Sequence, residues 1–133
     1  LQLTAYSLQL TSYAFGGFVN FEKLDVWKRA SRLCADVYIE TKSLKDYGFR
    51  DQLTRSALSV PSNIAEGMTR SSDKEKRRFL EIARSSMAEA RTQIYIGIEI
   101  DYLKREIAKN WVEETKQISA MISGLINSFD NNL

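Results

Sequence analysis

Residues 57–70, ALSVPSNIAEGMTR, contain the only proline among the 133 residues of the chain. Two interpretations are open for this stretch: a loop that carries a reactive site, or a proline-kinked helix whose polar groups are structural. Apolar residues recur there at intervals of three or four: Phe49, Leu53, Ala57, Val60, Ile64 and Met68. That spacing is typical of one helical face, and it continues across Pro61. The pattern therefore favours a helix over a loop.

Pro61 should lie inside this helix and not at the start of a new one. In the second case Val60 would be the N-cap, and valine is a poor capping residue. A proline inside a helix removes one N–H and crowds the carbonyl four residues earlier, here that of Ala57, at a cost of about 3 kcal/mol. We therefore expect a helix that is kinked at Pro61, with burial of the flanking apolar face offsetting this cost.

The opposite face of the same helix is small or polar. Its members are Gln52, Ser56, Ser59, Asn63, Glu66 and Arg70. Such a stripe either faces water or lets a second helix approach closely, with hydrogen bonds across the contact. Gly67 predicts that the helix ends near residues 67–69, because glycine is common at helix C-termini.

The rest of the chain predicts three more helices. One runs from about residue 24 to 44, with Cys34 on its apolar face. The next begins after Ser72, which forms a capping box with Glu75, and its apolar spacing continues to Ile98. The last runs from about residue 105 to 129. Four long helices with short connections predict an all-α fold, an up-down-up-down antiparallel four-helix bundle.

The segment IYIGIEI, residues 94–100, alternates like a strand. No turn signal separates it from the helix before it, and a lone strand would have no partner, so we expect helix there. Its apolar residues then lie on several sides of the helix. This predicts burial against both its own bundle and a second subunit.

Composition excludes several classes of active site. The chain has no histidine, so neither a Ser-His-Asp nor a Cys-His system is available. Its single cysteine allows neither an internal disulfide nor a multi-cysteine zinc site, and it fits a reducing, cytoplasmic location. No apolar run approaches the roughly 20 residues needed to span a bilayer. We expect no enzyme, no cofactor, no metal and no membrane partner.

Residues 1–20 form a separate N-terminal appendage, ahead of a bundle domain at residues 21–133. LQLTAYS at 1–7 is followed by LQLTSYA at 8–14, a seven-residue repeat without a charge. Leu3, Tyr6, Leu10 and Tyr13 are spaced three, four and three residues apart, which would suit a helix with one apolar face, although two repeats do not establish a coiled coil. The alternative is an appendage without a function in the fold. Gly16 and Gly17 separate the repeat from the domain.

Four stretches of the bundle domain resemble the four helix bundle protein family, also called the 23S rRNA intervening-sequence protein family. These stretches are FEKLDVWKRASRL (21–33), YGFRDQLTRSALSVPSNIAEGMTRSS (47–72), RRFLEIARSSMAEARTQ (77–93) and ISAMISGLINSF (118–129). SVPSNIAEG is the most specific part, and the resemblance covers residues 21–133. It implies a four-helix bundle that commonly assembles as a ring-like homopentamer, and it implies no enzymatic activity.

A relative in fold is the accessory variability determinant of diversity-generating retroelements. The resemblance implies that such proteins work with a reverse transcriptase and bind nucleic acid through a basic surface. This chain departs from that pattern because its formal net charge is only +2. It also has LKDYGF where the family usually has an FP element between the first two helices.

Two groups of residues are candidates for a site. Pro61, Asn63, Glu66 and Gly67 form the first, which we interpret as a structural motif at the corner between the second and third helices; an anion site or a catalytic carboxylate is the alternative. Glu66 and Arg70 are spaced for an ion pair. The second group is basic and would contact phosphates of RNA or DNA. It consists of Arg70, Lys74, Arg77, Arg78 and Arg84.

Two functions from different classes follow. The first is a non-catalytic oligomeric scaffold or adaptor that assembles with copies of itself, as a homopentamer. The second is a nucleic-acid-binding accessory factor, associated with an rRNA intervening sequence or with a reverse transcriptase.

Overall fold

The computed structural model describes residues 20–129 of the chain. The seven-residue repeat and nearly all of the predicted appendage lie outside the described residues, as do residues 130–133. The elements follow the order η1 (Phe21–Lys23), α2 (Asp25–Thr41), α3 (Tyr47–Met68), α4 (Asp73–Glu99) and α5 (Arg105–Ser128).

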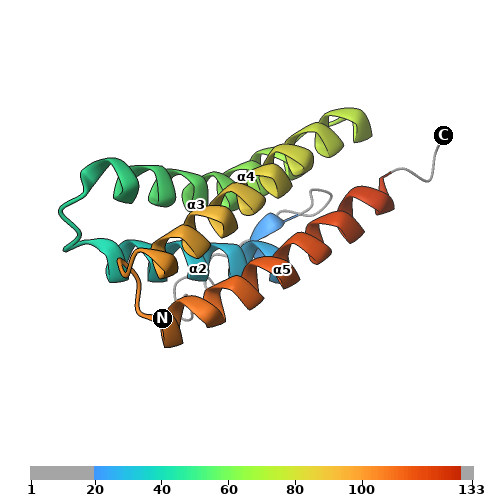
Figure 1. Cartoon of the computed structure of the whole chain (residues 1–133). Coiled ribbons are helices and arrows are strands. Elements are labelled where there is room, and N and C mark those ends of the chain that lie inside the picture. Colours follow the sequence, from blue (N-terminus) through green and yellow to red (C-terminus); the bar gives the residue numbers. More distant parts are fainter. Residues whose placement is uncertain (1–19, 130–133) are drawn as a thin grey trace.

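The four α-helices lie side by side and alternate in direction (Figure 1). The α2–α3 and α4–α5 connections lie at one end of the bundle, and the α3–α4 corner lies at the other. The predicted all-α four-helix bundle is confirmed, and residues 94–99 are helical as expected. The short 3-10 helix η1 was not predicted. Among residues 20–129 no helix combines the length and the apolarity needed to cross a bilayer.

The core consists of aliphatic side chains contributed by every helix. The largest ones with almost no exposure include Val37, Leu53, Ile64, Leu80, Met87, Ile94, Ile118 and Ile122. Full burial of such a side chain stabilises the fold by about 1.5–3 kcal/mol. Cys34 belongs to the same cluster, and burial raises the pKa of its thiol to about 11. Cys34 is therefore a core residue, as its position on an apolar face predicted.

Helix α3 is continuous from Tyr47 to Met68, with Pro61 buried inside it. This confirms the helix and excludes the loop. The kink at Pro61 remains a prediction. The helix begins two residues earlier than its apolar pattern indicated, because the Asp46 carboxylate caps it by accepting a hydrogen bond of 3.1 Å from the Phe49 N–H.

The small polar stripe of α3 faces α4. The hydroxyls of Ser59 and Ser86 lie 2.8 Å apart, and the Ser56 hydroxyl donates to the Glu89 carboxylate at 2.9 Å. The Asn63 amide donates to the Ser59 carbonyl at 2.8 Å. Of the two interpretations of this stripe, the structure confirms the close contact with hydrogen bonds across it.

Helix α3 ends at Met68, within the predicted range 67–69, but Gly67 is not the residue that caps it. It lies within the last turn of α3 and does not adopt the left-handed conformation of a C-terminal glycine. Instead, a Cβ atom at residue 67 would lie 2.9 Å from the Phe79 Cβ and 3.3 Å from the Lys76 carbonyl oxygen. Gly67 is therefore required for the close approach of α3 and α4 at their corner.

The opposite end of the bundle is closed by a hydrogen-bonded turn after α4. Asp101 adopts a left-handed backbone, with φ at 60°. The N–H of Tyr102 then donates to the Gly97 carbonyl at 2.9 Å, and that of Asp101 donates to the Ile98 carbonyl at 3.1 Å, which is a Schellman motif. The Tyr102 hydroxyl also donates to Asp46 at 2.9 Å, so this turn is tied to the start of α3.

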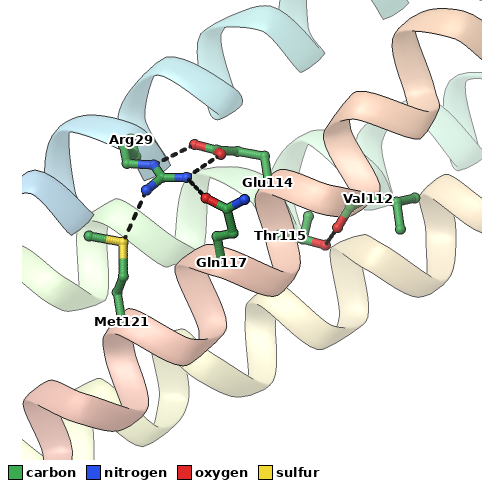
Figure 2. A network of polar contacts seen from close by, with 6 residues as sticks. All are labelled: Arg29, Val112, Glu114, Thr115, Gln117 and Met121. Carbon is green, nitrogen blue, oxygen red and sulfur yellow. Dashed lines mark hydrogen bonds and ion pairs between the residues drawn. The ribbon is translucent and has the colours of Figure 1, made fainter.

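Arg29 makes polar contacts between helices α2 and α5. Figure 2 shows Arg29 of α2 reaching across to α5, where Nε and Nη2 donate to the two carboxylate oxygens of Glu114 at 2.9 and 2.5 Å. Nη2 also donates to Gln117, and Nη1 lies 3.5 Å from the Met121 sulfur. The bond to Glu114 raises the pKa of Arg29 above its ordinary value. This bidentate pair fixes the register of α5 against α2.

We expect Gly67→Ala to lower the free energy of unfolding by about 1–3 kcal/mol, because the added methyl group overpacks the α3–α4 corner. Gly48→Ala is the matched control, since a Cβ there would meet only Asp46 Oδ1 at 3.6 Å. Alanine at residue 48 should be neutral or stabilising by up to about 1 kcal/mol. Urea unfolding of both variants measures the difference, and equal stability of the two would contradict the packing argument.

Candidate functional site

The structure divides the five predicted basic residues between two sides of α4. Arg70, which follows α3, and Lys74 and Arg78 in the first turns of α4 gather at the α3–α4 corner. Arg77 and Arg84 instead point to α5. We name Arg70, Lys74, Arg78 and the ring of Phe79 the corner cluster.

Phe79 organises the corner cluster. The guanidinium carbons of Arg70 and Arg78 lie 4.6 and 4.5 Å from the centroid of its ring. A cation over an aromatic face is attracted to the ring. The Phe79 side chain is only 8% exposed, so its ring supports the arginines and is not a platform on which a base could stack. The cluster is therefore suited to phosphates and not to base recognition.

Carboxylates partly offset the charge of the cluster. Glu66 pairs with Arg70 at 3.1 Å, and Glu75 pairs with Arg78 at 2.7 Å. The hydrogen bond from Arg78, with the nearby charges of Arg70 and Lys74, lowers the pKa of Glu75 below its ordinary value. The Glu66–Arg70 pair has the spacing that the sequence predicted. A phosphate at this corner would have to compete with both carboxylates.

Hydrogen bonds between side chains and the backbone hold the corner between α3 and α4 in place. The Ser72 hydroxyl caps α4 by accepting from the Glu75 N–H at 3.1 Å, which confirms the predicted N-cap. The reciprocal bond of a capping box is replaced, because the Glu75 carboxylate accepts from Arg78. The Lys76 ammonium donates to the Arg70 carbonyl and holds the residues between α3 and α4.

Arg77 and Arg84 belong to an arginine ladder on α4 whose third member is Arg91. Arg77 donates to the Phe129 carbonyl at 2.6 Å, and Arg84 donates to the Ser123 hydroxyl at 3.1 Å. Arg91 donates to Thr115 Oγ1 at 2.8 Å and to Ser119 at 2.7 Å. The sequence analysis did not single out Arg91. The signal was present, since three arginines at intervals of seven residues lie on one helical face.

One exposed side of α4, next to its contact with α3, carries apolar side chains. Ile82, Ile96 and Ile100 are 38%, 48% and 47% exposed. Their spacing places them in one stripe, with Ser85 and Glu89 between them. We name these five residues the α4 outer face. A shallow hollow of about 390 Å³ lies over its first half.

The residues of the predicted structural motif make the packing contacts described above. Asn63 bonds to Ser59, Glu66 pairs with Arg70, and Gly67 lies against Phe79. Within residues 20–129 no three acidic or cysteine side chains are grouped closely enough to hold a metal ion.

Comparison with known proteins supports the fold and the family. The profile of the family described as 23S rRNA-intervening sequence protein matches residues 22–124. A crystal structure from Bacteroides thetaiotaomicron, described as a protein with unknown function from the S23 ribosomal protein family, is similar with a TM-score of 0.71 and 20% identity. The similarity covers 76% of this chain and 97% of that one, and at this identity it shows the fold alone. No curated protein matches the sequence.

The arginine ladder generates a stability prediction. Arg91→Met should lower the free energy of unfolding by about 1–3 kcal/mol, because it removes charged hydrogen bonds and leaves the fully buried Thr115 hydroxyl without its donor. Arg84→Met is the matched control, because it removes only one bond from an exposed side chain. Chemical denaturation should show a clearly smaller loss for the control, and a loss as large as that of Arg91→Met would refute the assignment.

Proposed function

Because the chain belongs to the 23S rRNA-intervening sequence protein family, we propose that it is a non-catalytic oligomeric scaffold or adaptor whose copies assemble through the α4 outer face. The proposed assembly is a homopentamer. Its proposed location is the cytoplasm, where reducing conditions suit a chain with one buried thiol.

The exposed isoleucines of the α4 outer face carry this proposal. Ile82 and Ile96 are two heptads apart, and Ile100 follows one turn later, so all three present one edge to a neighbouring helix. Ile96 and Ile100 lie one turn apart and form an exposed apolar patch, and such patches commonly mark interaction sites. Ser85 supplies a polar group between them, and the Glu89 carboxylate beside it is held by Ser56 of α3.

The assembly proposal predicts that Ile96→Glu with Ile100→Glu dissociates the oligomer. Two carboxylates placed in a contact between apolar side chains would lose hydration without gaining a partner. Light scattering and sedimentation at tens of micromolar should show an oligomer for the unmodified protein and a monomer for the double variant. Circular dichroism should show unchanged helicity, because both side chains are already exposed in the single chain.

The control for this experiment is Ile39→Glu on α2, whose side chain is also 48% exposed. It makes the same chemical change away from the α4 outer face and should leave the oligomer intact. If the unmodified protein is monomeric at these concentrations, the scaffold proposal fails. If Ile39→Glu dissociates the oligomer and the α4 variant does not, the interface lies elsewhere.

A second candidate function is the binding of RNA or DNA, with a reverse transcriptase as a possible protein partner. The observation that favours it is the corner cluster, where three basic side chains share one exposed corner with the N-terminus of α4. Phosphate binding needs clustered positive charge and is helped by free N–H groups at a helix start. In an oligomer each cluster would be repeated, so a modest site would gain affinity through multivalency.

The nucleic-acid hypothesis predicts opposite effects from two changes at the corner cluster. Arg70→Ala with Arg78→Ala should weaken binding to all sequences alike and reduce the salt dependence by roughly one unit for each lost phosphate contact. Glu75→Gln should strengthen binding, because it removes the carboxylate that pairs with Arg78. Fluorescence anisotropy with labelled RNA and DNA over a salt series measures both effects.

The control is Arg77→Ala with Arg84→Ala, which removes the same number of charges from the arginine ladder instead of the cluster. It should reduce affinity less than the double change at the corner. Absence of binding by the unmodified protein at low salt would eliminate this second function and leave the scaffold proposal standing.

A further inference from the structure

We infer that a cavity at one end of the bundle binds a free amino acid by its ammonium and carboxylate groups. The cavity has a volume of about 170 Å³ and lies between the end of α2 and the start of α5, at the end of the bundle that holds the α2–α3 and α4–α5 connections (Figure 1). We name it the end cavity. Its lining includes Glu40, Ser43, Leu103, Lys104, Ala108 and Trp111. The inference is independent of the functions proposed above.

The end cavity has a buried apolar floor and a polar rim. Leu103, Ala108 and Trp111 form the floor and are 7%, 0% and 5% exposed. The rim consists of exposed polar side chains, those of Glu40, Ser43 and Lys104. One water needs about 10–15 Å³ of such volume, so the cavity has room for a molecule of several non-hydrogen atoms. An apolar floor below a few polar groups is the usual form of a small-molecule site.

The buried indole of Trp111 has an N–H group without a hydrogen-bond partner among residues 20–129. The sealed side-chain atoms that lack a partner in this part of the chain are Asn20 Nδ2 and Gln93 Oε1, so the Trp111 nitrogen is not sealed in the core and opens to a cavity. A long side chain on a helix points back towards the N-terminus, which places the Trp111 ring over Ile107 and Ala108 at the end cavity. A buried donor in this position is suited to an acceptor on a ligand.

The α5 side of the end cavity favours a carboxylate. Helix α5 begins after Lys104, and no side chain caps its first turn. The N–H groups of that turn therefore have no side-chain acceptor, and the helix dipole adds a partial positive charge there. The Lys104 ammonium on the rim adds a full positive charge to the same side.

The α2 side of the end cavity favours an ammonium group. Helix α2 ends at Thr41, and the helix dipole gives its C-terminus a partial negative charge. The last turn of α2 contains no basic residue that would offset this charge. The Glu40 carboxylate lies in that turn and lines the cavity. Two helix ends of opposite polarity, each with a full charge of the same sign, therefore meet at one cavity.

The two charged sides select a molecule that carries both charges close together. Neither Glu40 nor Lys104 forms an ion pair within residues 20–129, so both charges are available to a ligand. A free α-amino acid carries an ammonium and a carboxylate on one carbon atom and is small enough for the cavity. A simple carboxylate would be repelled by Glu40, and a simple amine would be repelled by Lys104. The Trp111 N–H would donate to the carboxylate of the amino acid.

Titration followed by ¹H–¹⁵N NMR tests the inference directly. The chain has two tryptophans, Trp27 and Trp111, so its spectrum contains two indole N–H signals. Glycine, L-alanine and L-serine are the probes, and we expect at least one of them to shift the Trp111 signal saturably at millimolar concentrations while the Trp27 signal stays in place. Acetate and methylammonium, which each keep one of the two charges, should bind at least tenfold more weakly. No saturable shift with any of the three amino acids, or equal binding of acetate, would overturn the inference.

Variants of the rim locate the site. Glu40→Gln and Lys104→Gln should each weaken binding of the amino acid at least tenfold, because each removes the charge that faces one end of the ligand. Both side chains are exposed, so circular dichroism should show an unchanged fold.

The matched control is Arg32→Gln. Arg32 lines a separate hollow of about 250 Å³ that borders the Trp111 ring and does not include Glu40 or Lys104. The control removes a charge of the same sign as Lys104→Gln, and it should leave the affinity unchanged. A loss in Arg32→Gln as large as that in Lys104→Gln, or an unchanged affinity in either rim variant, would refute the assignment to the end cavity.

Discussion

The close approach of α3 and α4 is the contact on which the rest of the structure depends. It is possible because Gly67 has no side chain and because the serines between the helices are small. The Ser59 and Ser86 hydroxyls bond to each other, and the Ser56 hydroxyl donates to Glu89. The same approach places the Phe79 ring against the end of α3. Arg70 and Arg78 gather over that ring, so the corner cluster is a consequence of this packing.

Helix α4 is the organising element because its faces have different chemistry. One bonds to α3 through small polar groups, one binds α5 through an arginine ladder, and one carries isoleucines outward. The arginine ladder binds neutral acceptors, hydroxyls and carbonyls, in α5. Charge density along a sequence is therefore a poor guide to a binding surface, since two of the five candidate residues, Arg77 and Arg84, bond towards α5. The other three gather at the corner between α3 and α4.

The fold could be predicted from the sequence because the buried face of a long helix is visible in the spacing of its apolar residues. Apolar spacing and the Ser72 cap located the helices, whereas the polar stripe of α3 left open whether it faces water or another helix. Prediction was weaker where an interaction joins distant residues. Arg91 was missed because its acceptors lie on another helix. Gly67 was predicted only as a residue that ends the helix, because its crowding by Phe79 depends on how α3 packs against α4.

The sequence by itself determined the all-α class, the helix boundaries to within a few residues, the burial of Cys34 and the exclusion of histidine-based chemistry. These depend on composition and on interactions within one or two helical turns, which the chain encodes locally. Only the tertiary structure decided which basic residues share a surface, which isoleucines stay exposed and where the bundle is left open. Those outcomes depend on how each helix is rotated about its axis against its neighbours. A rotation of one residue position, about 100°, would exchange one face for another.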